Sequence, residues 1–472
     1  MAERKFIYDS WEYSVEKFQA LAKRKPYAER FRLEYYHLLR ENTKTKKMAK
    51  DWVINALSVF KLFMDIMTLQ LRGRPVKWGD KPVVALVTKN NVYLQNIKPL
   101  LIFLAENGTN LKIFCPQKHY GFIKNILGEQ VSAHLYAIEG FNYQAGFFTR
   151  LLKLPASLIA AFYGTFWLAF QPVKKRFWFS AVFGRYAITE YFFGKQLRLL
   201  FKSGAKLIAA NDHWMWESLF FTAARDANAL SYVLEHGVIG DTTYPIFARQ
   251  FLAWGQYDAE KLKNEYGARP DEVRIVGSPH FDNVFEKITK HKTTVSQFDK
   301  PFITFLSQYF FGSNSMEPGY YQQIIDRFCA LAPLAERFGK QLVIKLHPSD
   351  KIKYYAGLPE NVTISTDPLL DVLDKTCMAF TVDSTAIFES MMYGIPTCQC
   401  GVAGMIRLKF NFIVSAEGYL NSYEEIALFA ENLLGNAIQY ETRVKEGMTG
   451  LSKYYYDLGS NSSVKRVFDL LN

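Results

Sequence analysis

The segment Tyr232-Val-Leu-Glu-His-Gly-Val-Ile-Gly-Asp-Thr-Thr-Tyr244 joins a short apolar strand to a loop rich in glycine and threonine. The expected strand ends at Glu235-His236-Gly237, a titratable pair followed by a glycine. In open α/β sheets, ligands bind beyond the carboxyl ends of the strands. The segment therefore predicts an α/β sheet with a functional loop at its carboxyl edge.

A second segment of the same kind, Leu342-Val-Ile-Lys-Leu-His-Pro348, lies further along the chain. Around both segments, apolar strands alternate with segments of helical periodicity, a pattern typical of doubly wound parallel sheets. We therefore predict an α/β protein with two Rossmann-like domains that face each other across a cleft. The expected strands are 82–88, 111–115, 133–138, 205–210, 250–255 and 273–279 in the first half, and 302–306, 342–346, 362–364, 378–382 and 396–398 in the second.

The domain limits follow from this alternation. We expect an N-terminal helical segment (1–75), a first Rossmann-like domain for the acceptor (76–285), a second for the nucleotide donor (300–450) and a C-terminal helix (451–472). The polar, Lys- and Thr-rich residues 283–300 are expected to link the domains. The N-terminal segment has apolar residues at helical spacing, which fits either a helix packed on the first domain or a membrane-surface or partner helix.

The composition is that of a globular protein with an unusual charge. The chain has 472 residues, 49% hydrophobic and 22% charged, enough for two or three domains. Its formal net charge of +12 indicates an anionic partner, such as lipid headgroups or a nucleotide diphosphate, unless the protein is simply basic. No nucleic-acid motif accompanies the charge, so a nucleic-acid partner is not expected.

The cysteines and the absence of several motifs limit the expected compartment and cofactors. The five cysteines are scattered without zinc-type spacing, which fits reduced thiols in the cytoplasm. No apolar run follows the first residues, so no secretion signal is expected. The sequence has no Asp-X-Asp, P-loop or Gly-x-Gly-x-x-Gly motif, and we expect neither a metal nor a resident cofactor.

An aromatic insertion at about 145–200 interrupts the first domain. Within it, residues 154–170 form 17 positions without a charge, and basic residues flank them on both sides. This length lies at the lower edge of what spans a bilayer. The favoured interpretation is an interfacial segment with its lysines on lipid phosphates, and the alternatives are a buried core helix or a true span.

The second half carries candidates for binding a nucleotide. His347 ends a strand just before a proline turns the chain, with Lys345 beside it, and Ser307 begins the loop after the preceding strand. Ser384 and Thr385 open a helix and would either cap it or bind a phosphate. Glu389, on the same helix, would receive a ribose hydroxyl or be an ordinary surface carboxylate.

The first half carries candidates for proton transfer. His236 and Glu235 are candidate general bases, since a histidine titrates near neutral pH. The alternatives are a strand-end histidine with a structural role and a glutamate that pairs with an arginine. Asp212 and His213, at the end of another expected strand, are further candidates on the acceptor side.

These motifs together resemble a group of bacterial enzymes. The set is the His-Gly loop, Trp254-Gly, Gly277-Ser-Pro-His-Phe-Asp282, Lys-Leu-His-Pro, and Ser-Thr-(x)3-Glu-(x)4-Gly-Ile-Pro. It is similar, over roughly 205–400, to the two-Rossmann (GT-B) transferases of surface polysaccharide. These include capsule and lipopolysaccharide glycosyltransferases, His-Pro-motif sialyltransferases and CDP-glycerol glycerophosphotransferases. The resemblance implies that His347, Ser384 and Thr385 hold the donor phosphates and that His236 is the base.

The expected function is therefore a metal-independent, inverting glycosyltransferase. It would move a sugar from a nucleotide-sugar donor to a growing surface glycan, such as a lipid-linked one, on the inner face of the cytoplasmic membrane. The alternatives are a CDP-polyol phosphotransferase of teichoic-acid-like polymer synthesis, a sugar-nucleotide 2-epimerase, and a non-catalytic glycan- or nucleotide-binding protein.

Overall fold

The computed structural model describes most of the chain after residue 75. The described ranges are 76–140, 188–212, 215–237, 246–291, 296–308, 318–348, 357–382, 384–402, 419–459 and 462–472, with a few single positions and short pieces elsewhere. The expected N-terminal helical segment and the uncharged segment 154–170 lie outside these ranges, apart from isolated positions. Within the described part, no helix is both long and apolar enough to cross a membrane.

The first domain is built on a seven-stranded parallel sheet in the order β3-β2-β1-β4-β5-β6-β7. Its strands are short and mostly buried along their whole length, because helices cover both faces. Alternate residues of β1 point to opposite faces: Val84 and Leu86 join one core cluster, and Val83 and Ala85 join the other. The strands are β1 (Val83–Leu86), β2 (Leu111–Cys115), β3 (Leu135–Ala137), β4 (Lys206–Ala209), β5 (Ser231–Leu234), β6 (Gln250–Ala253) and β7 (Val273–Ile275).

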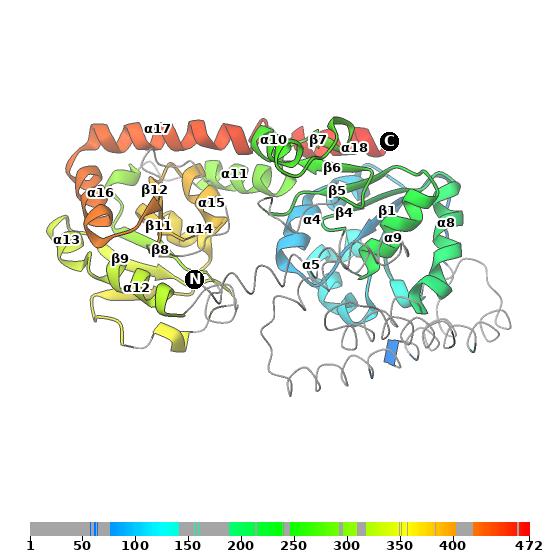
Figure 1. The fold of residues 1–472 in the computed structure, drawn as a ribbon, viewed down its shortest axis with the longest axis horizontal. Coiled ribbons are helices and arrows are strands. Elements are labelled where there is room, and N and C mark those ends of the chain that lie inside the picture. Colours follow the sequence, from blue (N-terminus) through cyan, green and yellow to red (C-terminus); the bar gives the residue numbers. More distant parts are fainter. Residues whose placement is uncertain are drawn as a thin grey trace, which may run out of the picture.

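Two layers of helices enclose this sheet (Figure 1). One face is covered by α4 (Asn91–Glu106), α5 (Tyr120–Ser132) and the C-terminal α18 (Ser462–Leu471). The other face is covered by α8 (Lys195–Lys202), α9 (Met215–Asp226) and α10 (Gln256–Asn264).

The second domain repeats the plan with a six-stranded parallel sheet in the order β10-β9-β8-β11-β12-β13. The strands are β8 (Phe302–Leu306), β9 (Gln341–Lys345), β10 (Val362–Ser365), β11 (Thr376–Thr381), β12 (Thr397–Cys400) and β13 (Tyr419–Leu420). Its helices are α12 (Pro318–Cys329), α13 (Ala332–Arg337), α14 (Leu369–Leu373), α15 (Ala386–Met392) and α16 (Tyr423–Gly435). In both sheets the first and fourth strands of the domain are neighbours, which creates the switch point where doubly wound folds bind ligands. The predicted pair of Rossmann-like domains is confirmed.

The segment expected as a polar linker contains a packed helix instead. The first part of 283–300 belongs to α11 (Pro279–His291), which contacts α4 of the first domain and α15 of the second. Phe281, Val284 and Ile288 recur at helical spacing and are buried, although lysines and threonines surround them in the sequence. The connection between the domains is therefore a structured helix over this stretch.

The chain returns to the first domain at its end. Figure 1 shows α17 (Ala437–Tyr454) extending from the second domain to the first, where α18 then packs on α4. Around the crossing, four aromatic rings from both domains form what we call the junction cluster: Trp254, Phe281, Phe388 and Tyr455. Ring centroids are 5.3 Å apart for Trp254 and Phe281, 4.6 Å for Phe281 and Tyr455, and 5.1 Å for Phe388 and Tyr455.

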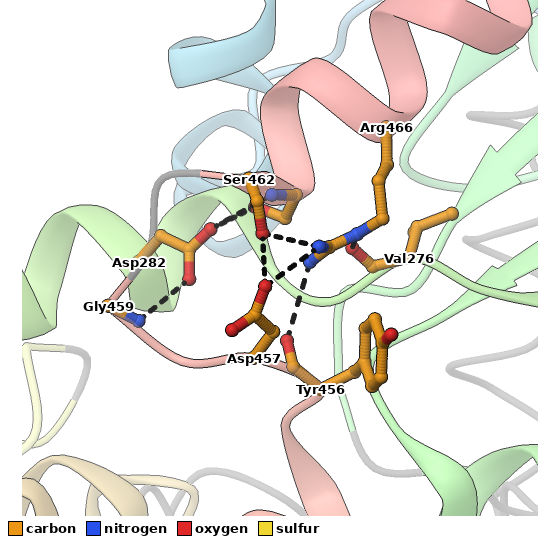
Figure 2. A network of polar contacts seen from close by, with 8 residues as sticks. Val276, Asp282, Tyr456, Asp457, Gly459, Ser462 and Arg466 are labelled. Atoms are coloured by element: carbon orange, nitrogen blue, oxygen red, sulfur yellow. Dashed lines mark hydrogen bonds and ion pairs between the residues drawn. The ribbon is translucent and has the colours of Figure 1, made fainter.

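A polar network fixes the start of α18 (Figure 2). The Asp282 carboxylate accepts hydrogen bonds from the backbone N–H groups of Gly459 and Ser463, both at 3.3 Å. Arg466 donates to the Val276 carbonyl at 2.8 Å and contacts Asp457 at 3.2 Å. The end of the Gly277–Asp282 motif thus anchors the C-terminal helix to the first domain.

Candidate functional site

The loop after β5 presents Glu235 and His236 in opposite ways. Glu235 is fully buried, and its Oε2 accepts a hydrogen bond of 2.6 Å from the Trp254 backbone N–H. Its carbonyl accepts from the Trp254 indole at 3.0 Å. Burial, and then the neighbouring Asp258, raise the pKa of Glu235 well above its usual range. A protonated, enclosed carboxyl cannot take a proton from an acceptor, so a base role for Glu235 would require it to leave this position.

Helix α10 contacts the same loop through a buried lysine. Lys261, which is buried, donates from Nζ to the Ile239 carbonyl at 2.9 Å. Asp258, also buried, has its pKa raised to about 6 by burial, against the opposing effects of Glu235 and Lys261. A proton on Glu235 can be donated to the neighbouring Asp258, whose ionised form Lys261 also favours. The loop that carries His236 is thus held near both ends by buried side chains.

His236 lies against the first turns of α4. Its half-buried ring makes an edge-to-face contact with Tyr93, with centroids 4.3 Å apart. The Asn96 side chain donates to the His236 carbonyl at 3.4 Å. Of the two candidate bases, His236 is therefore the more accessible, since its side chain is half-buried and Glu235 is fully buried, although the Nδ1 of His236 is enclosed. Tyr93 and Asn96 were missed from the sequence, because only their amphipathic helix, not their contact partner, is visible there.

A small cavity opens at the switch point of the first sheet, between β1 and β4. Its lining includes Thr88, Tyr93, Asn211 and Glu217. Asn211 and Glu217 are buried polar residues and were not predicted as site residues. Because Tyr93 borders both this cavity and His236, the cavity adjoins the candidate base.

Asp212 has a different position from the one predicted. It is buried, and its Oδ2 accepts hydrogen bonds from the backbone N–H groups of Phe247, at 2.6 Å, and Ala248, at 3.2 Å. The carboxylate therefore fixes the chain segment before β6 and does not face an acceptor. His213 lies outside the described residues.

In the second domain, three predicted residues meet at one edge of the sheet. The ends of β9, β8 and β11 are in register, with Leu306 paired to both Lys345 and Thr381. Ser307, His347 and Ser384 follow these three strand ends directly or within three residues. The Ser307 hydroxyl accepts a hydrogen bond of 2.9 Å from the His347 backbone N–H. Burial lowers the pKa of His347, so its imidazole is neutral at pH 7.

A buried polar network supports the His347 loop. Ser307 donates to Asp350 at 3.3 Å, and Tyr355 donates to the same carboxylate at 2.5 Å. The Tyr355 hydroxyl also contacts that of Tyr321 at 2.7 Å. These supporting residues were not predicted, since nothing in the spacing of the two tyrosines marks them as partners of a histidine loop.

Lys345 does not reach the cleft in this conformation. It is buried, and its Nζ donates to the Leu346 carbonyl at 2.6 Å. Burial lowers the pKa of Lys345. The predicted contact with a donor phosphate would require this amine to break its present hydrogen bond.

The start of α15 carries the remaining candidates. The half-buried Ser384 accepts from the Ala386 backbone N–H at 3.3 Å, and Thr385 is exposed without a side-chain capping bond. Glu389 is half-buried, but its Oε2 is enclosed and has no hydrogen-bond partner. Burial raises the pKa of Glu389 to about 7. An enclosed carboxylate oxygen without a donor is unusual and calls for a ligand or water to supply one.

Metal binding finds no obvious place in the described residues, which hold no group of three or more His, Cys, Asp or Glu side chains arranged for an ion. The expectation of a metal-free reaction stays a prediction. All five cysteines are buried and unpaired with one another.

Comparison with known proteins concerns the fold. No protein-family model and no curated protein sequence matches the chain. The fold is similar to that of UDP-GlcNAc 2-epimerase from Neisseria meningitidis bound to UDP-GlcNAc, with 12% identity, a TM-score of 0.51, and 82% of this chain and 99% of that chain covered.

Two further solved structures are less similar, with TM-scores below 0.5. S. aureus MnaA with UDP has 12% identity, a TM-score of 0.49, and 82% and 95% coverage of the two chains. A glycosyltransferase from Rickettsia africae has 11% identity, a TM-score of 0.44, and 84% and 98% coverage. The likeness to the epimerase supports the fold of two Rossmann-like domains, and the particular surface-polysaccharide families remain a prediction.

Proposed function

We propose that the protein is a nucleotide-sugar-dependent enzyme of the GT-B type, and specifically a glycosyltransferase. The observation that carries this proposal is the second sheet's switch point. There Ser307, His347 and Ser384 lie at adjacent strand ends, and on the helix that follows, Oε2 of Glu389 is enclosed and has no hydrogen-bond partner. This is where a doubly wound sheet binds a nucleotide.

The donor would bind with its ribose hydroxyls donating to Glu389. The neutral His347 imidazole and the hydroxyls of Ser384 and Thr385 would hydrogen-bond to the phosphates. Such donors stabilise the charge that develops on the leaving phosphate as the sugar departs. We propose that the reaction is metal-independent, with these uncharged donors making the phosphate contacts.

The acceptor would bind in the first domain beside His236. A general base in hydrogen-bond reach of the attacking hydroxyl takes up its proton as the new glycosidic bond forms. Attack from the face opposite the leaving nucleotide inverts the anomeric centre. The net charge of +12 supports an anionic environment, and we propose a growing, lipid-linked surface glycan at the cytoplasmic membrane as the acceptor.

A panel of CMP-, CDP-, UDP- and GDP-linked donors tests the proposal, scored for nucleotide release with and without glycan acceptors. UDP-GlcNAc is the first to try, because the epimerase that shares the fold was solved with it. We expect release that depends on acceptor, loss of donor binding in His347→Ala, and full activity in the control His134→Ala, which precedes the amino end of β3. Conversion of the donor to an isomer without release would indicate an epimerase, and full turnover in both His236→Ala and His347→Ala would refute the site.

Nucleotide binding is expected to release a proton at pH 7. With its pKa raised to about 7, Glu389 is about half protonated there in the free protein. Ribose hydroxyls that donate to the carboxylate favour its ionised form and lower the pKa. Calorimetry in buffers of different ionisation enthalpy should show release of up to about half a proton, which fades towards pH 9.

The release should vanish in Glu389→Gln and persist in Glu441→Gln, an exposed carboxylate on α17. Wild-type protein that binds nucleotide at pH 7 without any proton release would contradict the ribose contact.

A further inference from the structure

A second pocket, of about 580 Å³, lies on the side of α4 that faces away from His236. On an α-helix, residues three and four apart share a face. Tyr93 and Ile97 border the small cavity at the switch point, whereas Lys98, Ile102 and Glu106 line the second pocket. Helix α11 forms the opposite wall, and Val464 of α18 closes the space between them.

The pocket has an apolar wall beside its polar groups. Ile102, Val284 and Val464 contribute aliphatic surface from three different helices. Phe103, also on the lining, is fixed by an edge-to-face contact with Phe468, with centroids 5.3 Å apart. A cavity of this size that combines an apolar wall with convergent polar groups can hold a small organic ligand.

The charged groups at the border leave an excess of free cations. Lys98 on α4 and Lys287 on α11 form no ion pair in the part of the chain that the structure describes. Of the two carboxylates, Glu286 is paired with Lys290 at 2.5 Å. Glu106 is exposed and lies about 12 Å from Lys98 along the helix axis, where water screens it.

His280 adds a neutral polar group to the same lining. It stands in the first turn of α11, next to Asn283 on the pocket wall. Burial, and then Lys287, lower its pKa to about 4, so it carries no charge at neutral pH. A neutral imidazole can donate or accept a hydrogen bond to a ligand without adding charge.

We propose that this pocket binds a phosphate ester with an apolar or aromatic body. The anion lies between Lys98 and Lys287 and is hydrogen-bonded by His280 and Asn283, while the body rests on Ile102, Val284 and Val464. A phosphorylated isoprenoid and a free nucleotide share this chemistry. The site is independent of the proposed donor site, from which its lining residues are distinct.

Titration of the full-length protein with farnesyl phosphate, UMP, inorganic phosphate and farnesol tests the proposal. Binding is followed by calorimetry, and a His347→Ala background removes any contribution of the donor site. We expect at least one of the two esters to bind and to be weakened about tenfold or more by the double variant Lys98→Gln/Lys287→Gln. The control Lys124→Gln, an exposed lysine on α5, should bind like wild type.

The possible results distinguish a lipid phosphate from a nucleotide, and some of them would overturn the proposal. Binding of farnesyl phosphate alone assigns a lipid phosphate, and binding of UMP alone assigns a nucleotide. Inorganic phosphate or farnesol that binds as tightly as the ester would overturn the proposal, as would ester binding that the double variant leaves unchanged, or no ester binding at all. None of these results depends on whether the protein transfers a sugar.

Discussion

His236→Ala is expected to lower turnover by about 10²–10⁴-fold, the usual contribution of a general base, while donor binding is retained. The proposed donor site, around His347 and Glu389, lies on the other domain, so this substitution leaves it unchanged. The neighbouring Glu235→Gln should keep most of the turnover. A glutamine can accept from the Trp254 N–H and donate to Asp258, as the protonated carboxyl does.

Initial rates across pH check this pair of variants. The wild-type rate should fall at low pH as the base is protonated, and His236→Ala should lose that dependence along with its rate. His134→Ala controls for the loss of an imidazole elsewhere. The reverse pattern, an inactive Glu235→Gln and an active His236→Ala, would assign the base to the buried carboxyl instead.

The fold could be predicted because its signals are local. Short apolar runs between segments of helical periodicity identify each strand from β1 to β11 separately, and βαβ connections lead to parallel sheets. The strand order β9-β8-β11, which brings Ser307 beside His347, is a long-range property that no segment reveals alone. The same holds for Tyr93 and Asn96, more than a hundred residues before the histidine that they contact.

The sequence did not reveal in which direction a titratable side chain at a strand end points. Glu235 and His236 are adjacent, and successive residues at a strand end point to opposite faces. The alternation of the strand predicts that one of these two side chains is buried. Which one it is depends on the face of the sheet that Trp254 and α10 cover. Asp212 and Lys345 show the same limit: each is a titratable residue at a strand end, and each is turned inward to a backbone partner.

Composition misled at the domain junction. Lysine and threonine residues after Asp282 suggested an interdomain linker, whereas three apolar side chains at helical spacing bury α11 between the domains. Asp282 itself belongs to a motif quoted for its resemblance to enzymes, and its carboxylate caps the C-terminal helix. A motif residue can therefore serve the fold rather than the reaction.

Gly255→Ala is expected to destabilise the protein by about 3 kcal/mol or more, the upper range for forcing atoms into a packed site. The backbone conformation of Gly255, with φ −157°, suits any residue. The added Cβ, however, would lie 2.3 Å from the Tyr454 carbonyl oxygen and 2.8 Å from that of Lys453. Backbone atoms cannot rotate away as a side chain can, so the end of α17 must move.

That movement would reach beyond one contact, because Tyr455 follows directly and touches Trp254, Phe281 and Phe388 of the junction cluster. Thermal and urea unfolding should show the loss, and hydrogen exchange should rise first in α18, whose anchors come next in the chain. The control Gly121→Ala, in α5 with no atom within 4 Å of the new Cβ, should be neutral or slightly stabilising. Only the Gly255 substitution places an atom against the end of α17. Equal effects of the two substitutions would therefore mean that the returning C-terminal segment does not hold the two domains together.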